Sequence, residues 1–203
     1  MKTPDLPRTL RTSPPRRSSE LIRAVRTWVL GALLTGLVLG AVAGQPEVVE
    51  YQIKAAFLYK FGTYVQWPDQ AFAQADSPLT IGVMGADTVA DELVQISTGR
   101  TVNGHPVNVK RLHRGDPISG LHILFVARPD NGKLADILLA AKGQPILVVT
   151  ETEPPPMPGS MINFVVAGDK VRFDIALPSA EAGNLKLSAR LLTVARKVIG
   201  APS

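Results

Sequence analysis

The sequence predicts a single α/β domain of three layers (α/β/α), with a largely parallel sheet that closes in an antiparallel hairpin and a helix. Three short runs are apolar throughout, which is typical of strands covered on both faces: Leu79–Met84, His122–Ala127 and Ile146–Val149. Helical patterns separate these runs. Strands that alternate with helices indicate parallel β-α-β units, so the order of elements favours the α/β class.

The first helix is predicted over Val48–Gln66, ending before Trp67 and Pro68, because the residue before a proline is disfavoured in a helix. Its apolar residues recur every fourth position, at Ile53, Phe57, Phe61 and Val65. That spacing gives a wide apolar face. The aromatic residues of this segment therefore have two interpretations, core packing or contact with a partner, and the sequence does not separate them.

The other elements follow from period and turn residues. Helices are predicted over Val89–Ile96, with Asp87 as N-cap, and over Asn131–Lys142. Val107–Leu112 alternates like a strand. Near the C-terminus, two β-rich runs flank Gly168-Asp169, and the second places Val171, Phe173 and Ile175 on one side. A final helix is predicted over Leu187–Ile199, with an apolar face formed by Leu187, Leu191, Val194 and Val198.

Residues 1–43 have the three parts of a secretory signal: a basic start, the uncharged run from Trp28 to Gly44, and an exit at Ala41-Val42-Ala43. We therefore expect cleavage near Ala43, and a domain that spans residues 44–203. The alternative is a retained membrane anchor, although a bilayer span needs about 20 apolar residues and this run is shorter.

The charge balance argues against nucleic acid as a partner. The chain has 22 basic and 17 acidic residues, of which seven basic and two acidic lie in 1–43, so residues 44–203 hold 15 of each. Nucleic-acid binding rests largely on excess positive charge, and here that excess belongs to the signal. The chain has no cysteine, which excludes thiol catalysis, thiolate metal sites and disulfides.

No catalytic or metal-binding motif is present. The three histidines, His105, His113 and His122, have no histidine partner three or four residues away, and His122 opens an apolar strand, which favours a structural role. Neither a nucleophile elbow nor a phosphate loop occurs. We therefore predict no enzyme activity, no cofactor and no metal. The candidate binding residues for a partner or ligand are Tyr64, Trp67, Arg172 and Arg190. The two arginines have two interpretations, a groove against the last helix that binds a carboxylate, or surface ion pairs.

Several segments together resemble the YfiR-like family of periplasmic proteins. The matching pieces occur in order along nearly the whole of residues 47–199: Glu50–Phe61 with Val65–Pro68, Ile81–Gly85, Gly104–Val109, His122–Val126, Gly159–Phe164 with Val171–Ile175, and Leu185–Leu192. The resemblance implies a periplasmic repressor that restrains an inner-membrane diguanylate cyclase, so that cyclic di-GMP and biofilm formation fall. It also implies an outer-membrane lipoprotein as a second partner.

Leu121 stands before His122 where a redox-sensitive member of that family would carry a cysteine, so redox control is not expected. We expect a homodimer as the working form. The alternative function is a periplasmic small-molecule-binding sensor or transport-accessory domain that uses the arginines named above.

Overall fold

The computed structural model describes residues 46–128, 133–168 and 170–200, all within the unit Gly44–Ser203. The predicted signal segment, residues 1–43, lies outside the described residues. Among the described helices, none is both long and apolar enough to span a bilayer.

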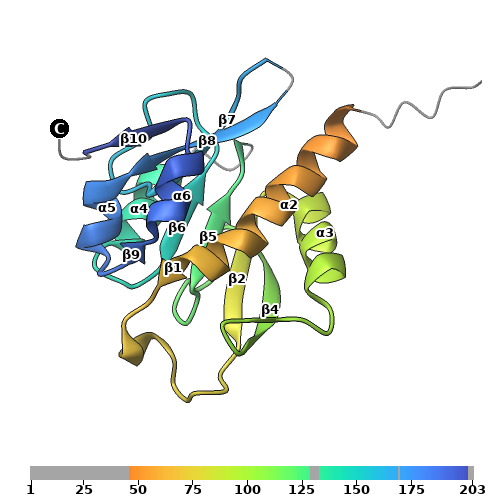
Figure 1. Cartoon of the computed structure of the whole chain (residues 1–203), viewed down its shortest axis with the longest axis vertical. Coiled ribbons are helices and arrows are strands. Elements are labelled where there is room, and N and C mark those ends of the chain that lie inside the picture. Colours follow the sequence, from red (N-terminus) through yellow and green to blue (C-terminus); the bar gives the residue numbers. More distant parts are fainter. Residues whose placement is uncertain (1–45, 129–132, 169, 201–203) are drawn as a thin grey trace, which may run out of the picture. The chain divides into compact units, whose positions relative to one another are not determined.

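In the described residues, eight strands form one sheet in the order β10-β8-β7-β6-β5-β2-β4-β3 (Figure 1). All neighbours are parallel except the pairs β7–β8 and β3–β4. The strands are β2 (Leu79–Met84), β3 (Thr101–Val102), β4 (His105–Leu112), β5 (Ile123–Val126), β6 (Leu147–Thr150), β7 (Ile162–Val166), β8 (Val171–Ala176) and β10 (Lys197–Ile199). The predicted fold class, with its largely parallel sheet and antiparallel hairpin, is confirmed.

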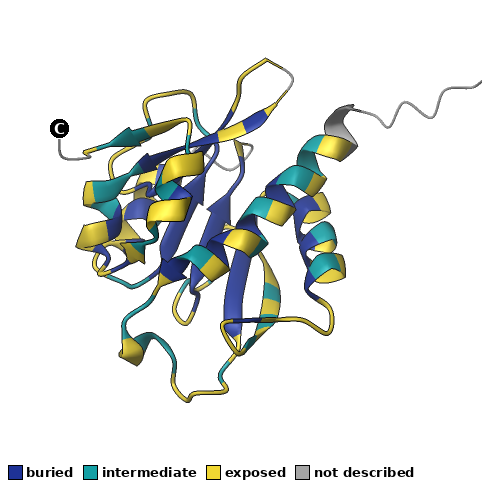
Figure 2. Cartoon of the chain, viewed as in Figure 1, coloured by how far each residue is buried: buried dark blue, intermediate teal, exposed yellow. Residues whose placement is uncertain are grey.

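Helices cover both faces of this sheet. The helices are α2 (Pro46–Tyr64), α3 (Asp87–Ser97), α4 (Leu134–Ala141), α5 (Leu177–Ala182) and α6 (Ala189–Val194). Residues of α2, α3 and α6 pack in one apolar cluster with Phe173 and Ile175 of β8, whereas α4 packs in a second cluster with Leu124 and Val148 on the opposite face. Figure 2 shows the central strands buried and the outer sides of the helices exposed.

The first helix ends two residues earlier than predicted. Val65 and Gln66 form a short strand, β1, that pairs antiparallel with β9 (Lys186–Leu187). Ser188 donates its amide proton to the oxygen of Tyr64, 2.9 Å away, which extends this two-stranded ribbon toward α6. The ribbon therefore joins the end of α2 to the start of α6.

The prediction of one C-terminal helix over Leu187–Ile199 is wrong. Helix α6 spans only Ala189–Val194, and Ala195 is extended, with φ −65° and ψ 146°. The Arg196 amide donates to Phe173 O at 2.8 Å, and its guanidinium binds both carboxylate oxygens of the buried Asp174. This pairing draws the chain onto the sheet edge, where β10 lies parallel to β8.

One smaller prediction needs correction, and one helix was missed. Helix α3 begins at Asp87 itself, so Ala86 occupies the N-cap position and no side chain caps the helix. Helix α5, which follows β8 directly and has Pro178 in its first turn, was not predicted. Its six residues are too few for a periodic apolar pattern to be recognised.

Candidate functional site

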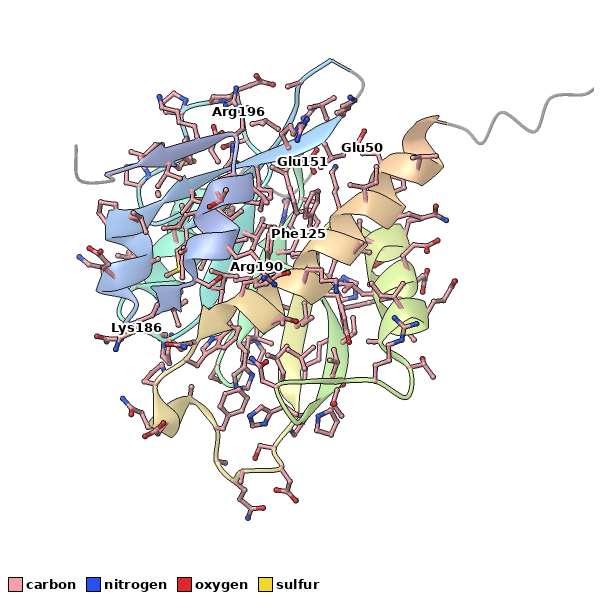
Figure 3. All side chains as sticks on the ribbon, viewed as in Figure 1. Glu50, Phe125, Glu151, Lys186, Arg190 and Arg196 are labelled. Carbon is pink, nitrogen blue, oxygen red and sulfur yellow. The ribbon has the colours of Figure 1, made fainter. Side chains whose placement is uncertain are left out.

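Three of the four predicted binding residues surround the ribbon. Tyr64 ends α2, Trp67 follows β1, and Arg190 lies in the first turn of α6, two residues after Ser188. Figure 3 shows Arg190 beside the C-terminal half of α2, and α2 and α6 are in contact. Tyr64 and Trp67 are half-buried and Arg190 is exposed. We call Tyr64, Trp67 and Arg190 the ribbon surface.

Trp67 is half-buried and contacts residues at the end of the sheet. Its Nε1 donates a hydrogen bond to His122 O at 3.2 Å, and its ring meets the rings of Phe72 and His122 edge-on. Pairs of this kind add about 1 kcal/mol beyond area burial. Trp67 therefore packs at the end of the sheet and remains partly exposed.

Arg172 lies apart from the ribbon surface. On β8, Val171, Phe173 and Ile175 face the cluster that includes Leu191 of α6. Because side chains alternate along a strand, Arg172 projects from the opposite face, where it is exposed. Arg172 and Arg190 therefore do not line a shared groove.

Some aromatic residues of the predicted first helix pack in the core, whereas others keep exposed surface that a partner could contact. Phe61 is buried and Phe57 half-buried, and both pack against Phe164 and Phe173, with ring centroids 5.2–6.1 Å apart. These two phenylalanines belong to the core. Tyr59, Tyr64 and Trp67 are half-buried and retain exposed surface, so the interpretation as partner contacts stays open for these three residues.

A second candidate site lies at the carboxyl end of the parallel strands. After β2 the chain turns through α3 toward β4, whereas after β5 it turns through α4 to β6 on the other side. The ends of β2 and β5 thus form a topological switch point, the position where open α/β sheets bind ligands. A cavity of about 340 Å³ opens there, lined by Gly85–Val89, Phe125, Ala127, Arg128, Glu151 and the N-terminal part of α2.

Buried charges line this cavity. Lys54 of α2 is only 3% exposed, and its Nζ lies 2.5 Å from a Glu50 oxygen and 2.9 Å from a Glu151 oxygen. Arg128 approaches the same Glu151 oxygen at 3.4 Å. Figure 3 shows Glu50 and Glu151 together at the end of the sheet beyond Phe125. With Asp87, which also lines the cavity, two basic and three acidic side chains surround it, so it offers both hydrogen-bond donors and acceptors to a small charged molecule.

Sequence reasoning missed this cluster. Lys54 sits on the predicted first helix, while Glu151 follows β6 and Arg128 follows β5, so only the parallel order of the strands brings them together. The available signal was a lysine within the apolar face of a helix, one turn after Glu50.

His122 has the structural role that the sequence favoured. It is 5% exposed, its Nδ1 accepts the Thr80 amide proton at 3.0 Å, and its Nε2 lies 3.1 Å from Ala71 O. The basic residues near the end of β4 (Lys110, Arg111, His113 and Arg114) are exposed, and Arg111 pairs with Asp91 of α3. In the part of the chain that the structure describes, no group of three or more histidine, aspartate or glutamate residues is arranged to hold a metal ion.

By its fold, the chain is a mixed α/β domain with a largely parallel sheet and helices on both faces. It belongs to the YfiR/HmsC-like family, whose model matches residues 51–196. This match confirms the resemblance seen in the sequence. A search of curated protein sequences found no significant match.

Proposed function

We propose that the chain is a periplasmic regulatory protein that restrains an inner-membrane diguanylate cyclase and so lowers cyclic di-GMP. The observation that carries this proposal is the family match, which spans residues 51–196 and therefore nearly all of the described domain. The role is regulatory rather than catalytic. The signal predicted in residues 1–43 would bring the protein to the compartment where it meets the periplasmic segment of the cyclase.

The cyclase contacts the ribbon surface in this proposal. Interface energy concentrates in a few aromatic and arginine residues, and Tyr64, Trp67 and Arg190 are of these types. Trp67 is also anchored by its hydrogen bond to His122 O, so little side-chain entropy is lost when a partner covers it. A homodimer and an outer-membrane lipoprotein are the further proposed partners, the lipoprotein competing with the cyclase for the protein.

Affinity purification of the tagged full chain from its native cells tests the contact. A diguanylate cyclase, identified by mass spectrometry in the membrane fraction, is expected to co-purify. Arg190→Glu should reduce the recovery of the cyclase at least tenfold. The substitution replaces a positive charge, which the proposed interface would bury, by a negative charge. Arg172→Glu on the opposite face is the matched control and should not reduce it. Equal recovery with both variants would exclude the ribbon surface, and absence of any cyclase would contradict the proposal itself.

A small-molecule-binding sensor or transport-accessory domain is the second candidate function. The cavity at the switch point, with its buried Lys54 and Glu151, favours it. Thermal melting of the purified protein with a panel of small charged solutes tests this function. A solute that raises the melting temperature of the natural protein, but not of a Lys54→Met/Glu151→Gln double variant, would support binding there. Equal shifts in both proteins would exclude the cavity.

A further inference from the structure

An apolar cavity lies between helices α4 and α5. Its volume is about 610 Å³, within the range of small-molecule sites. Its lining shares no residue with the ribbon surface or with the cavity at the switch point. The buried apolar side chains of the lining are Leu138 and Ala141 of α4, Val148 of β6, and Met161, which precedes β7. The floor of the cavity is therefore made of core side chains.

Two apolar side chains of the lining remain exposed to water. Leu139 of α4 is 71% exposed and Met157, in the segment between β6 and β7, is 37% exposed. Single exposed apolar residues are common in soluble proteins. These two residues, however, come from different elements and border the same cavity. A molecule that fills the cavity would therefore remove both from water, and burial of apolar surface favours binding.

The lining has few side chains that can form hydrogen bonds. None of the described lining residues is aromatic or acidic, and their polar side chains are Lys142 and Ser179. A ligand with polar groups along its length would lose hydrogen bonds to water there without replacement. A planar ring would find no aromatic face to pack against, whereas flexible methionine side chains adapt to an aliphatic chain. The cavity therefore fits a hydrocarbon chain with one polar end.

The charge of that polar end follows from Lys142. Lys142 is the only charged residue among the described lining residues; it is exposed, and no ion pair between described residues includes it. It is not needed to cap α4, because Gln144 donates its amide proton to Ala141 O at 3.0 Å and a side-chain proton to Ala140 O at 2.8 Å. An anionic group at the edge of the cavity would thus have a cation beside it and no carboxylate in the lining.

We propose that this cavity binds a free fatty acid, an unbranched aliphatic monocarboxylate. The hydrocarbon chain lies against Leu139, Met157 and Met161, and the carboxylate lies beside Lys142. Burial of methylene groups supplies the affinity, whereas the exposed ion pair adds little and selects the sign of the head group. The inference does not depend on the proposed cyclase partner, because the site shares no residue with the ribbon surface.

Isothermal titration calorimetry of the purified protein, stripped of bound lipid, tests the proposal. The probes are octanoate, decanoate and dodecanoate below their micelle concentrations. A single site per chain is expected, and the affinity should rise about fourfold for each added methylene group. Dodecylammonium, which has an amine head on a chain of the same length, should bind more weakly than dodecanoate. No binding, an affinity independent of chain length, or equal binding of the two head groups would overturn the proposal.

Methionine methyl signals in NMR spectra locate the bound chain. The methyl signals of Met157 and Met161 should shift on addition of dodecanoate, because both residues line the cavity. Met84 is buried but does not line the cavity, so its signal is the internal control and should not shift. Saturable binding that leaves Met157 and Met161 unchanged would place the fatty acid elsewhere and contradict the proposal. Signals of these two residues that respond to protein dilution but not to dodecanoate would overturn it as well, by assigning the cavity to a contact between two copies of the chain.

Two variants, each with a matched control, test the assigned contacts. Ala182→Phe adds a ring to the α5 wall and should lower the dodecanoate affinity roughly tenfold, because a filled cavity no longer accepts the chain. Ala140→Phe places the same ring on an exposed position of α4 outside the lining and should have no effect.

Lys142→Glu should weaken dodecanoate binding about threefold and strengthen the binding of dodecylammonium. Lys186→Glu on β9, outside the lining, should change neither. Melting temperatures without ligand show whether each variant is folded, and the chain-length series on the natural protein decides the proposal where a variant is not. Unchanged dodecanoate affinity in both Ala182→Phe and Lys142→Glu would contradict the proposal.

Discussion

The indole Nε1 of Trp67 donates a hydrogen bond to the main-chain oxygen of His122, 3.2 Å away. This contact joins residues 55 positions apart and ties the end of the first helix to the start of a central strand. The same oxygen also accepts the amide proton of Leu147, at 2.8 Å, so it is satisfied from both sides.

Trp67→Phe should therefore lower the free energy of unfolding by only about 1 kcal/mol, because His122 O keeps its bond to Leu147. Trp67→Ala also removes the ring contacts with Phe72 and His122, and should cost about 3 kcal/mol. Urea unfolding of the two variants measures both values. Equal costs would show that the indole N–H, and not the ring, fixes this corner.

Lys54→Met should destabilise the protein by about 3–5 kcal/mol, because it leaves the buried Glu151 carboxylate without its closest cation. Adding Glu151→Gln should recover most of the loss, since the unpaired charge then disappears. Lys60→Met is the control on the exposed side of the same helix and should change stability by less than about 0.5 kcal/mol. A double variant no more stable than Lys54→Met would argue against the ion pair as the cause.

Arg196→Ala should detach β10 from the sheet edge. The hydrogen bonds to Asp174 raise the pKa of Arg196, so the guanidinium stays charged and can bind the buried Asp174. Hydrogen–deuterium exchange of residues 197–199 should accelerate in this variant, while Arg172→Ala should leave it unchanged. Unaltered exchange in Arg196→Ala would show that backbone pairing alone holds the strand.

The C-terminal segment shows which structural features a local sequence pattern cannot predict. The central strands were predictable because they are apolar on both faces, and β2 has the predicted bounds. The spacing of Leu187, Leu191, Val194 and Val198 is that of one face of a helix. In the structure, however, Val198 and Ile199 pair with Ile175 and Ala176 of β8. What decides between helix and strand is the Arg196–Asp174 pair, a contact between residues 22 positions apart that no local pattern contains.

The grouping of the candidate-site residues likewise depends on contacts between segments that are far apart in the sequence. Tyr64, Trp67 and Arg190 come together because β1 pairs with β9, and two-residue strands leave no periodic signal in a sequence. Arg172 is exposed, but whether it shares a face with Arg190 depends on the side of the sheet that α6 covers. The Lys54–Glu151 pair depends likewise on strand order.

Redox conditions should not alter stability. The chain has no cysteine, and Leu121 is buried against Gly82 and Leu112 in the second apolar cluster. Melting curves with and without a thiol reductant are expected to coincide. In cells, relief of repression by reducing stress would place the redox sensor in another component.

Cellular cyclic di-GMP in a strain that lacks the gene tests the central claim most directly. We predict that the nucleotide level rises on deletion and returns to normal when the full chain is supplied again. A chain without residues 1–43 should stay in the cytoplasm and fail to restore the level, because it does not meet the periplasmic segment of the cyclase. An unchanged or lower cyclic di-GMP level in the deletion strain would contradict the account.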